Sequence, residues 1–455
     1  MQYLSKPPSR RFSLNLLGTL TASLLLGSGV LAAAEPNAAP MLVIKNARIF
    51  DGRDLRPETR LTLRISEGKI VAVQTDETAA SVGETTPVTV IDAGGRLVLP
   101  GFIDAHVHPS IPLGFTTLRE TDPNYVANRA AIEARAMLQR GFTTTRDMGG
   151  PSFGLKQAID EGLIEGPRIF PSGAMISQTS GHGDFRSRDA AARAGDTPDV
   201  MESRGYGAIA DGEAVVLTAV REQLRSGASQ IKVAAGGGLY SMYDPIDSVQ
   251  YLESELKAAV RAAADWGTYV AVHAYTPTAI RRAVEAGVKS IEHAHLIDDG
   301  TMKLIAERGV FLSPQAYVFG GAFPMTGKGA AIATGLDRMM KLAQQYIVRV
   351  AFGTDMFGAP RVYGWQSREF GARLQWFTPL EILRQATSIN GELLALSGPR
   401  NPYGGAALGV VATGAWADLL IVDGDPLENL RLLEDPERNL RIIVKSGKII
   451  KNTLP

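Results

Sequence analysis

Six histidines occur in the chain, and four of them stand at or just after short apolar segments. His106 and His108 follow the run 98–105, and His273 and His293 each follow a short run of their own. Residues i and i+2 of a strand point to the same side, so His106 and His108 present two imidazoles to one centre. Such a pair is typical of a site for Zn²⁺ or a similar divalent ion.

Each histidine also has a simpler explanation. His106 and His108 could be a surface pair on an edge strand, and a lone strand histidine such as His273 is more often a hydrogen-bonded core residue than a ligand. Four histidines at strand ends together favour metal binding over both alternatives.

Two charged residues stand at comparable positions. Asp355 closes the last predicted strand of the region and is expected to be a ligand and general base, although an aspartate there could be a helix N-cap. Lys232 lies in the apolar run 230–234, where a buried ammonium is costly. Burial lowers the pKa of a lysine, and the neutral amine can react with CO₂ to form a carbamate, an anionic bidentate ligand. An ion pair with Glu292 explains Lys232 equally well, and spacing alone does not decide.

A weak internal repeat predicts how these side chains are positioned. Each unit has a helical stretch, a glycine that fits a helix C-cap, a short apolar strand and a polar residue near the strand end. Eight strands are predicted: 97–105, 142–146, 168–172, a strand reaching 232, 269–272, 288–292, 310–313 and 349–352. Eight alternating units predict an α/β fold with a (β/α)₈ TIM-like barrel, whose chemistry lies at the C-terminal strand ends. An open Rossmann-like sheet is the alternative, but no G-x-G-x-x-G follows a strand.

Both ends of the chain predict short strands separated by turns. The predicted strands are Met41–Ile49, Leu61–Ile65, Lys69–Gln74, Val88–Asp92, Ala417–Val422, Leu440–Val444 and Lys448–Ile450. We therefore expect a small β-sandwich domain built from residues 35–97 and 405–455, beside a barrel domain of residues 98–404.

Composition narrows the possible partners. The 455 residues include 47 basic and 47 acidic ones, which gives no electrostatic reason to expect nucleic acid or an anionic membrane surface. Cysteine is absent, which excludes disulfides and thiolate ligands, so a metal must be held by His, carboxylate or modified Lys.

Residues 1–34 have the pattern of a secretory signal peptide: a basic start, an apolar stretch and the small residues 32–34. We expect cleavage, a periplasmic or secreted enzyme and no membrane contact afterwards; an uncleaved anchor is the alternative. The pair Arg10-Arg11 only partly matches a twin-arginine signal, so the export route stays open.

As a set, six residues resemble the two-metal subtype of the amidohydrolase superfamily, which has a bridging carboxylated lysine: His106, His108, Lys232, His273, His293 and Asp355. Segments 98–106 and 417–427 look like that superfamily's first-strand signature and its C-terminal sandwich strand. The likeness covers roughly residues 42–450 and implies a distorted (β/α)₈ barrel plus a β-sandwich.

Within the superfamily the chain resembles the imidazolonepropionase-like branch, which includes Xaa-Pro dipeptidases and enzymes that hydrolyse ochratoxin-type N-acyl amino acids. Segments 143–147, 177–184 and 290–294 carry this likeness. Tyr275 stands where relatives often show a second histidine, and Ser180 stands where glycine is common, so both bear on the substrate pocket. Imidazolonepropionase itself is disfavoured, because a single-metal enzyme does not need Lys232.

The resemblance implies two divalent ions, expected to be zinc, one held by His106, His108 and Asp355 and the other by His273 and His293. Carboxylated Lys232 bridges them. A hydroxide shared by the ions attacks the amide carbonyl of a dipeptide or N-acyl amino acid, and Asp355 transfers the proton to the leaving amine.

Further residues are expected to meet the substrate or to support the site. His182, in a glycine-flanked segment, is expected to contact the oxyanion or a substrate carboxylate, or else to order its own loop. Tyr240 and Tyr275 are candidate pocket residues, and His295 is expected to be structural or to support the ligands. Segment 357–377 should overhang the site and could bind a carboxylate.

Three functional questions stay open. The arginine-rich segment 184–213 is expected to form a lid or an oligomer contact, and we expect a homo-oligomer. A lactonase or phosphotriesterase could use the same two-metal centre. A non-catalytic barrel scaffold is a more distant alternative, since no ligand position has been lost.

Overall fold

The computed structural model describes residues 40–58, 60–75, 87–188, 190, 198–241, 243–321 and 325–454. The predicted signal peptide lies outside these residues, so the leader and the export route stay predictions. Among the residues described, no helix has the length and apolarity needed to cross a membrane.

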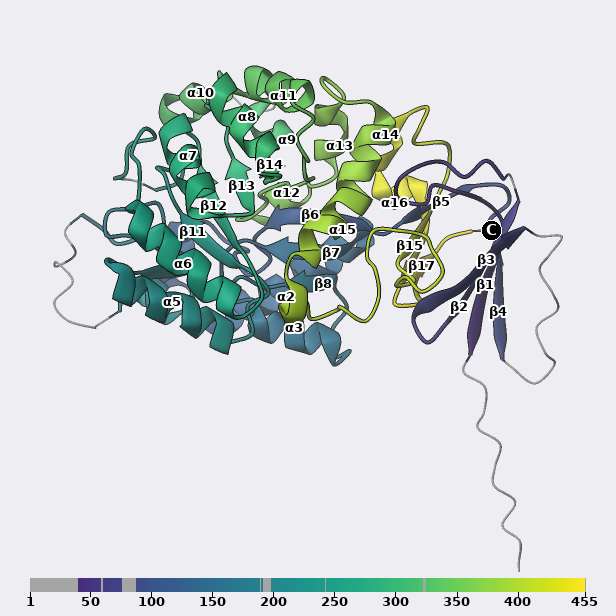
Figure 1. Ribbon diagram of the computed structural model, residues 1–455. Helices are drawn as coiled ribbons and strands as arrows, with labels where there is room; N and C mark the ends of the chain where they lie inside the picture. Colours follow the sequence, from purple (N-terminus) through teal and green to yellow (C-terminus); the bar gives the residue numbers. More distant parts are fainter. Residues whose placement is uncertain are drawn as a thin grey trace, which may run out of the picture. The chain divides into compact units, whose positions relative to one another are not determined.

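Two parallel sheets form the region in which the barrel was predicted (Figure 1). The larger runs in the order β10 (Gly207–Ile209), β9 (Met175–Ser177), β11 (Ile231–Ala234), β12 (Val270–Ala274), β13 (Ser290–His293) and β14 (Phe311–Ser313). The smaller contains β6 (Phe102–Val107), β7 (Phe142–Asp147) and β8 (Arg168–Phe170). Strands β9 and β10 were not predicted; each has only three residues.

Helices alternate with these strands, as predicted. They are α1 (Phe115–Glu120), α2 (Pro123–Gln139), α3 (Phe153–Asp160), α4 (Val200–Ser203), α5 (Glu213–Arg225), α6 (Glu253–Asp265), α7 (Pro277–Ala286), α8 (Asp299–Glu307), α9 (Ala316–Phe319), α10 (Gly327–Ala333), α11 (Leu336–Gln345), α12 (Pro360–Tyr363), α13 (Arg368–Arg373), α14 (Pro379–Arg384), α15 (Asn390–Ala395) and α16 (Pro436–Asn439). Helices α5, α6 and α7 pack side by side next to β11 and β12 (Figure 1).

The predicted eighth strand, 349–352, is wrong as a regular strand, because its backbone forms only an isolated bridge between Val350 and Leu312. Side chains take the place of the missing ladder: Arg373 donates to the carbonyl of Ala351, and Asn390 bonds to both the N–H and the carbonyl of Phe352. The segment nevertheless reaches both parallel sheets, since Ala351 N donates to Leu312 O in β14 and Phe352 O accepts from Ala105 N in β6. A continuous closed barrel stays a prediction.

Strands from both ends of the chain share one further sheet. Its order is β17 (Lys448–Asn452), β16 (Leu440–Lys445), β15 (Leu419–Val422), β5 (Leu97–Pro100), β1 (Met41–Ile49), β2 (Leu61–Ser66) and β3 (Lys69–Thr75), with β4 (Val88–Asp92) also paired to β1. All seven strands predicted for the chain ends are therefore present. A separate sandwich domain with the predicted boundaries stays a prediction.

The predicted strand 97–105 is two strands, β5 and β6, which break at Gly101. The N–H of Gly101 donates to the carbonyl of Asp418, and a Cβ at this position would lie 2.1 Å from Oγ1 of Thr143. Only glycine fits so close a contact. The chain thus leaves the sheet of the two ends at β5 and enters the parallel sheet at β6, which carries the first histidines.

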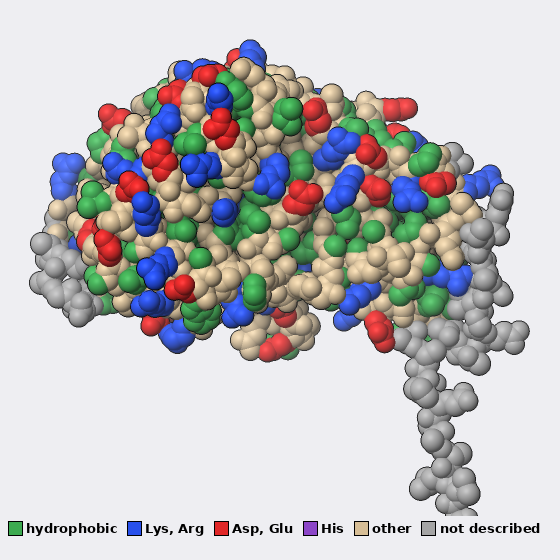
Figure 2. All heavy atoms as spheres, in the orientation of Figure 1, with side chains coloured by type: hydrophobic (Ala, Val, Ile, Leu, Met, Phe, Trp, Pro, Cys, Tyr) green, Lys and Arg blue, Asp and Glu red, His purple; other side chains and the backbone are tan. Residues whose placement is uncertain are grey.

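Charges are mixed on the surface. On the face drawn in Figure 2, Lys and Arg side chains alternate with Asp and Glu rather than gathering by sign. This distribution agrees with the balanced composition.

Candidate active site

All nine residues predicted to bind metal, to act in catalysis or to contact substrate line one cavity of about 440 Å³. They come from distant parts of the chain: His106, His108, His182, Lys232, Tyr240, His273, Tyr275, His293 and Asp355. His295 is not among the lining residues.

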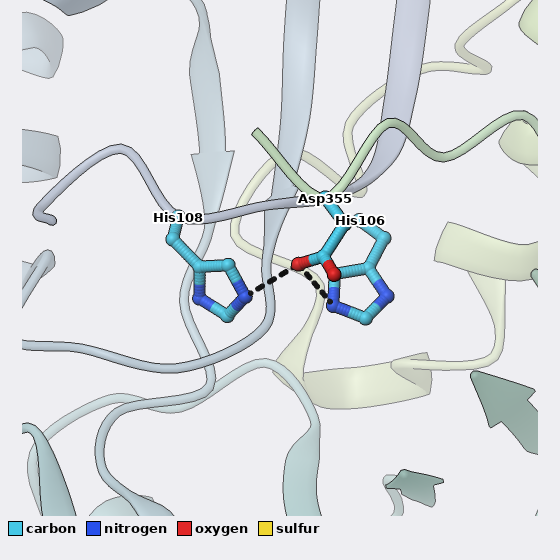
Figure 3. Close-up of side chains that lie close together, drawn as sticks. All are labelled: His106, His108 and Asp355. Atoms are coloured by element: carbon cyan, nitrogen blue, oxygen red, sulfur yellow. Dashed lines mark hydrogen bonds and ion pairs between the residues drawn. The ribbon is translucent and has the colours of Figure 1, made fainter. Parts of the chain in front are cut away.

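His106, His108 and Asp355 meet at the C-terminal end of β6 (Figure 3). Oδ1 of Asp355 lies 3.3 Å from Nε2 of His106 and 3.1 Å from Nε2 of His108. Asp355 has a φ of 55°, and its N–H donates to the carbonyl of His106. A left-handed backbone is costly for a non-glycine residue and is most often kept where a site needs it. Two imidazoles and one carboxylate make a donor set that fits a divalent cation.

Two of the simpler explanations do not hold. His106 is buried and His108 only slightly exposed, so they are not a surface pair. Asp355 is not a helix N-cap, since the next helix, α12, is capped at Ala359.

Each of the four predicted histidine ligands has one ring nitrogen held by the protein. The contacts join His106 Nδ1 to Glu292 Oε2 at 2.8 Å, His108 Nδ1 to Gly149 O at 3.0 Å, His273 Nε2 to Gly237 O at 3.0 Å and His293 Nδ1 to Gln315 Oε1 at 2.6 Å. Metal-binding histidines usually donate their second N–H to such a partner, which fixes the ring and its tautomer. The other ring nitrogen of each histidine is then available as a ligand.

Burial also holds several of these rings in the neutral form that binds metal. It lowers the pKa of His106 and of His273 well below the ordinary value, and it lowers the pKa of His293 to about 3. The charged form loses its hydration in the protein interior, so the imidazole stays deprotonated at neutral pH.

Lys232, in β11, is 2% exposed. Burial lowers its pKa to about 8, although the charges of Glu292 and Asp355 oppose the shift. The carboxylate of Glu292 accepts hydrogen bonds from Arg146 at 2.7 Å and from Ser290 at 2.6 Å. None of the ion pairs found in the described part of the chain includes Lys232, so the direct pair with Glu292 is not formed. The lowered pKa makes a neutral amine accessible near neutral pH, as carbamate formation requires.

The predicted substrate residues differ in their contacts and in their exposure. His182 follows β9; its ring stacks on that of His273 at 4.0 Å, and its Nδ1 lies 2.7 Å from Oγ of Ser241. Burial lowers the pKa of His182 to about 4. Tyr240 is 55% exposed, whereas Tyr275 is buried with its ring edge-on to His273. Contacts of these residues with substrate stay predictions.

His295 is buried next to this group. Its ring lies 6.4 Å from that of His293, and its Nε2 is 3.4 Å from the carbonyl of Gln315. This placement agrees with a structural or supporting position.

Arg146 is a residue behind the site whose role its place in the sequence did not indicate. This residue of β7 is fully buried; it donates to Glu292 at 2.7 Å and to the hydroxyl of Tyr269 at 3.2 Å. Glu292 in turn holds His106, so an ion pair stands directly behind a predicted ligand. The sequence did contain a signal for this pair, because an arginine inside a strand that is expected to be buried requires an acidic partner.

Much of the remaining cavity wall is apolar. Phe357, Val362 and Trp365 line it, so part of segment 357–377 overhangs the site as expected. The arginines of that segment bind elsewhere: Arg361 stacks on Trp365, Arg368 pairs with Glu434, and Arg373 pairs with Glu369. No arginine is found among the described lining residues, and the possibility that this segment binds a carboxylate stays open.

Segment 184–213 also contributes to the cavity, through Phe185 and Tyr206. Two of its arginines are engaged within the described part of the chain: Arg186 pairs with Asp184, and Arg204 donates to the carbonyl of Leu118. Residues 189 and 191–197 are not described, and a lid or an oligomer contact stays a prediction.

Comparisons with known proteins agree with this geometry. Residues 97–450 match the Amidohydrolase family model. The ochratoxinase of Aspergillus niger is 32% identical over 374 residues, which cover 78% of this chain and 76% of that protein. A solved prolidase complexed with N-methylphosphonate-L-proline is 35% identical, with a TM-score of 0.80 over 91% of this chain and 100% of that one. A solved Xaa-Pro dipeptidase with methionine in its active site is 28% identical, with a TM-score of 0.78 over 90% of this chain and 100% of that one. Because the family model matches residues 97–450, which is most of the chain, this chain belongs to the amidohydrolase family.

Proposed function

We propose that this hydrolase cleaves the amide bond of a dipeptide or an N-acyl amino acid in a metal-dependent reaction. The observation that carries the proposal is the ring of four histidines, each oriented through one nitrogen, around a cavity that also holds Asp355 and Lys232. Similarity to an ochratoxinase and to prolidases supports an amide or peptide bond as the target.

The donor sets fit two divalent ions, for which we propose zinc. His106, His108 and Asp355 would hold one ion, His273 and His293 would hold the other, and carboxylated Lys232 would bridge them. When bound, such ions lower the pKa of water and polarise a carbonyl oxygen.

Asp355 is proposed to move the proton. Its Oδ1 already faces the imidazoles of His106 and His108. Its Oδ2 is therefore the oxygen that takes the proton of the attacking water and passes it to the leaving nitrogen. A carboxylate in this position serves as base and then as acid within one turnover.

His182 is proposed to stabilise the developing oxyanion. Nδ1 of His182 lies 2.7 Å from Oγ of Ser241, and the neutral ring presents an Nε2–H to substrate when the Ser241 hydroxyl donates to Nδ1 instead of to the carbonyl of Gly238. The stacking of His182 on His273 keeps this ring beside the second predicted metal site.

The cavity wall favours an apolar group beside the scissile bond. Phe115 stacks on Phe185 at 4.6 Å and packs against Phe357 at 5.4 Å, and Tyr240 meets Phe357 edge-on at 4.8 Å. Aromatic walls of this kind bind flat apolar groups through area and ring geometry. Substrates with an aromatic or large aliphatic side chain are therefore expected to be preferred over charged ones.

A substrate panel tests the proposal. The purified, metal-loaded enzyme is assayed with N-acyl amino acids, Xaa-Pro and other dipeptides, lactones and phosphotriesters, with Asp355→Asn as the inactive control. We expect amide turnover that depends on Asp355. Strong lactone or phosphotriester turnover without amide turnover would reassign the reaction. A purified chain that takes up no metal when it is offered and turns over no substrate of any class would favour the scaffold alternative.

A further inference from the structure

The segment that links β11 to α6 contains a loop, residues 236–250, which we call the glycine loop because it begins with three glycines. Residue 242 is not described. The two ends of the loop are joined, since Gly237 N donates to Ser248 O and Gln250 N donates to Ala235 O. Leu239 and Tyr240 of this loop line the cavity. The loop is thus a wall of the site built on a closed base.

The glycine loop holds two of the site histidines from behind. The carbonyl of Gly237 lies 3.0 Å from Nε2 of His273, and Oγ of Ser241 lies 2.7 Å from Nδ1 of His182. A Cβ at Gly238 would lie 1.7 Å from Nδ1 of His182, so this ring packs directly on bare backbone. A displacement of the loop would therefore move both imidazoles.

Lys328, in α10, fastens the loop from outside the cavity. Its Nζ donates to three backbone carbonyls: Gly238 at 3.0 Å, Ser241 at 2.8 Å and Asp244 at 2.5 Å. An ammonium has three N–H donors, so this arrangement uses all of them. Hydrogen bonds from a charged donor are stronger than neutral ones.

The same lysine faces a buried acid that organises the loop. The Asp244 side chain is 1% exposed; its Oδ1 lies 3.5 Å from Nζ of Lys328, and its Oδ2 accepts from Gly238 N at 2.8 Å and from Gln250 Nε2 at 3.2 Å. Gln250 in turn accepts from the backbone N–H of His182 at 3.0 Å. A buried carboxylate requires a compensating charge, which Lys328 supplies.

We propose that Lys328 is a positioning residue, which clamps the glycine loop and thereby sets the places of His182, His273 and the wall formed by Leu239 and Tyr240. It is absent from the described cavity lining, so it acts through the loop and not on substrate. Without the clamp, the loop opens more often and the two histidines are less often in register.

Hydrogen exchange of the full-length protein tests the clamp without any assay of activity. Lys328→Met removes the ammonium and keeps the apolar stem, and Lys341→Met, at an exposed lysine of α11, is the matched control. Because the variant loses several charge-assisted bonds, we expect exchange of the amides in 236–250 to accelerate by about tenfold or more, and exchange in β12 and β13 to stay unchanged. The control should match the unaltered protein throughout.

Two results would overturn the clamp: unchanged exchange in 236–250, or equal acceleration in β11, β12 and β13 with a lowered melting temperature. The second would make Lys328 a general stabilising residue. Should Lys328→Met fail to fold, Lys328→Gln, which keeps an amide donor without the charge, gives the same comparison.

Kinetics add a second readout, which rests on the proposed function. We expect Lys328→Met to lower kcat through His182 and His273 and to raise KM through Leu239 and Tyr240, whereas Lys341→Met should change neither. If the unaltered enzyme turned over no amide, the proposed function would fail, but the exchange result would still decide the clamp.

Discussion

The residues that face the cavity depend on side chains one contact further away. His106 is held by Glu292, and Glu292 is held by Arg146, so a buried ion pair sets the ring of a predicted ligand. Such partners are fixed by the fold and not by their neighbours in sequence, because His106 and Glu292 are 186 residues apart. This explains why strand-end position predicted the ligands but not the groups that orient them.

Replacing Glu292 tests this arrangement. Glu292→Gln leaves the buried Arg146 without its counter-charge and weakens the hold on His106. We expect metal affinity to fall about 10–100-fold, as for other partners of ligating histidines. We also expect the metal-free protein to lose about 3–5 kcal/mol of unfolding free energy, the usual effect of an uncompensated buried charge. Metal titration and urea unfolding measure the two effects, with Glu253→Gln, at an exposed acid of α6, as control. Equal stability of the two variants would contradict the role of the buried pair.

His182 is tested separately from the metals. His182→Asn removes the proposed oxyanion donor while all six predicted ligands remain. We expect turnover to fall about 100-fold or more, the typical effect of losing one such donor, with an unchanged metal content. Steady-state kinetics and elemental analysis of the same sample measure both quantities. Unchanged turnover would show that His182 does not act in the mechanism, and ordering of its own loop would then be its role.

The strands that could be predicted from the sequence are mostly those marked by a clear run of apolar residues. All seven strands of the two chain ends were predicted, since apolar runs bounded by Gly and Asp mark them. Strands β9 and β10 were missed, and their length alone does not explain this, since β8 and β14 also have three residues each and lie in predicted strands. Segment 349–352 has the apolar character of a strand, but its backbone is bonded by Arg373 and Asn390, and side chains that arrive from later helices cannot be foreseen from local sequence.

Asn390, the first residue of α15, joins that segment to β6. Its side chain donates to Ile103 O and Phe352 O and accepts from Phe352 N. Asn390→Leu keeps the number of side-chain heavy atoms and removes the acceptor of Phe352 N, while Phe352 O keeps its bond from Ala105 N. The change should destabilise the protein by about 1–3 kcal/mol. Urea unfolding measures this loss. Glu392→Gln, at a half-exposed acid on the same helix, should have no measurable effect, and a similar loss in both variants would contradict the link.

For the whole molecule, gathering neutral histidines in one buried region makes stability depend on pH. Burial lowers the pKa values of five histidines: His106, His182, His273, His293 and His295. The pKa values of His182 and His295 fall to about 4. When the pH is below about 6.5, the ordinary pKa of histidine, these histidines bind protons in the unfolded chain but not in the folded chain. Stability is therefore complete above this pH and falls as the pH drops toward 4.

The metal-free protein should consequently be less stable at pH 5 than at pH 7.5. His182, His293 and His295, whose pKa values are lowered to about 3 or 4, each contribute a loss of about 2 kcal/mol over this range. Burial raises the pKa values of Asp104 and Asp147 to about 6, which opposes the loss by about 1.4 kcal/mol each, so the histidines prevail. Urea unfolding at the two pH values measures the difference. Equal or greater stability at pH 5 would mean that these rings are not buried in the neutral form.

Metal dependence of amide hydrolysis is tested most directly by stripping and reloading the purified enzyme. Elemental analysis is combined with an assay of an apolar N-acyl amino acid, before chelation, after it and after Zn²⁺ is restored. We predict two equivalents of metal per chain, loss of turnover with the metal and recovery on reloading. Undiminished turnover by a chain shown to contain no metal would contradict the two-metal site.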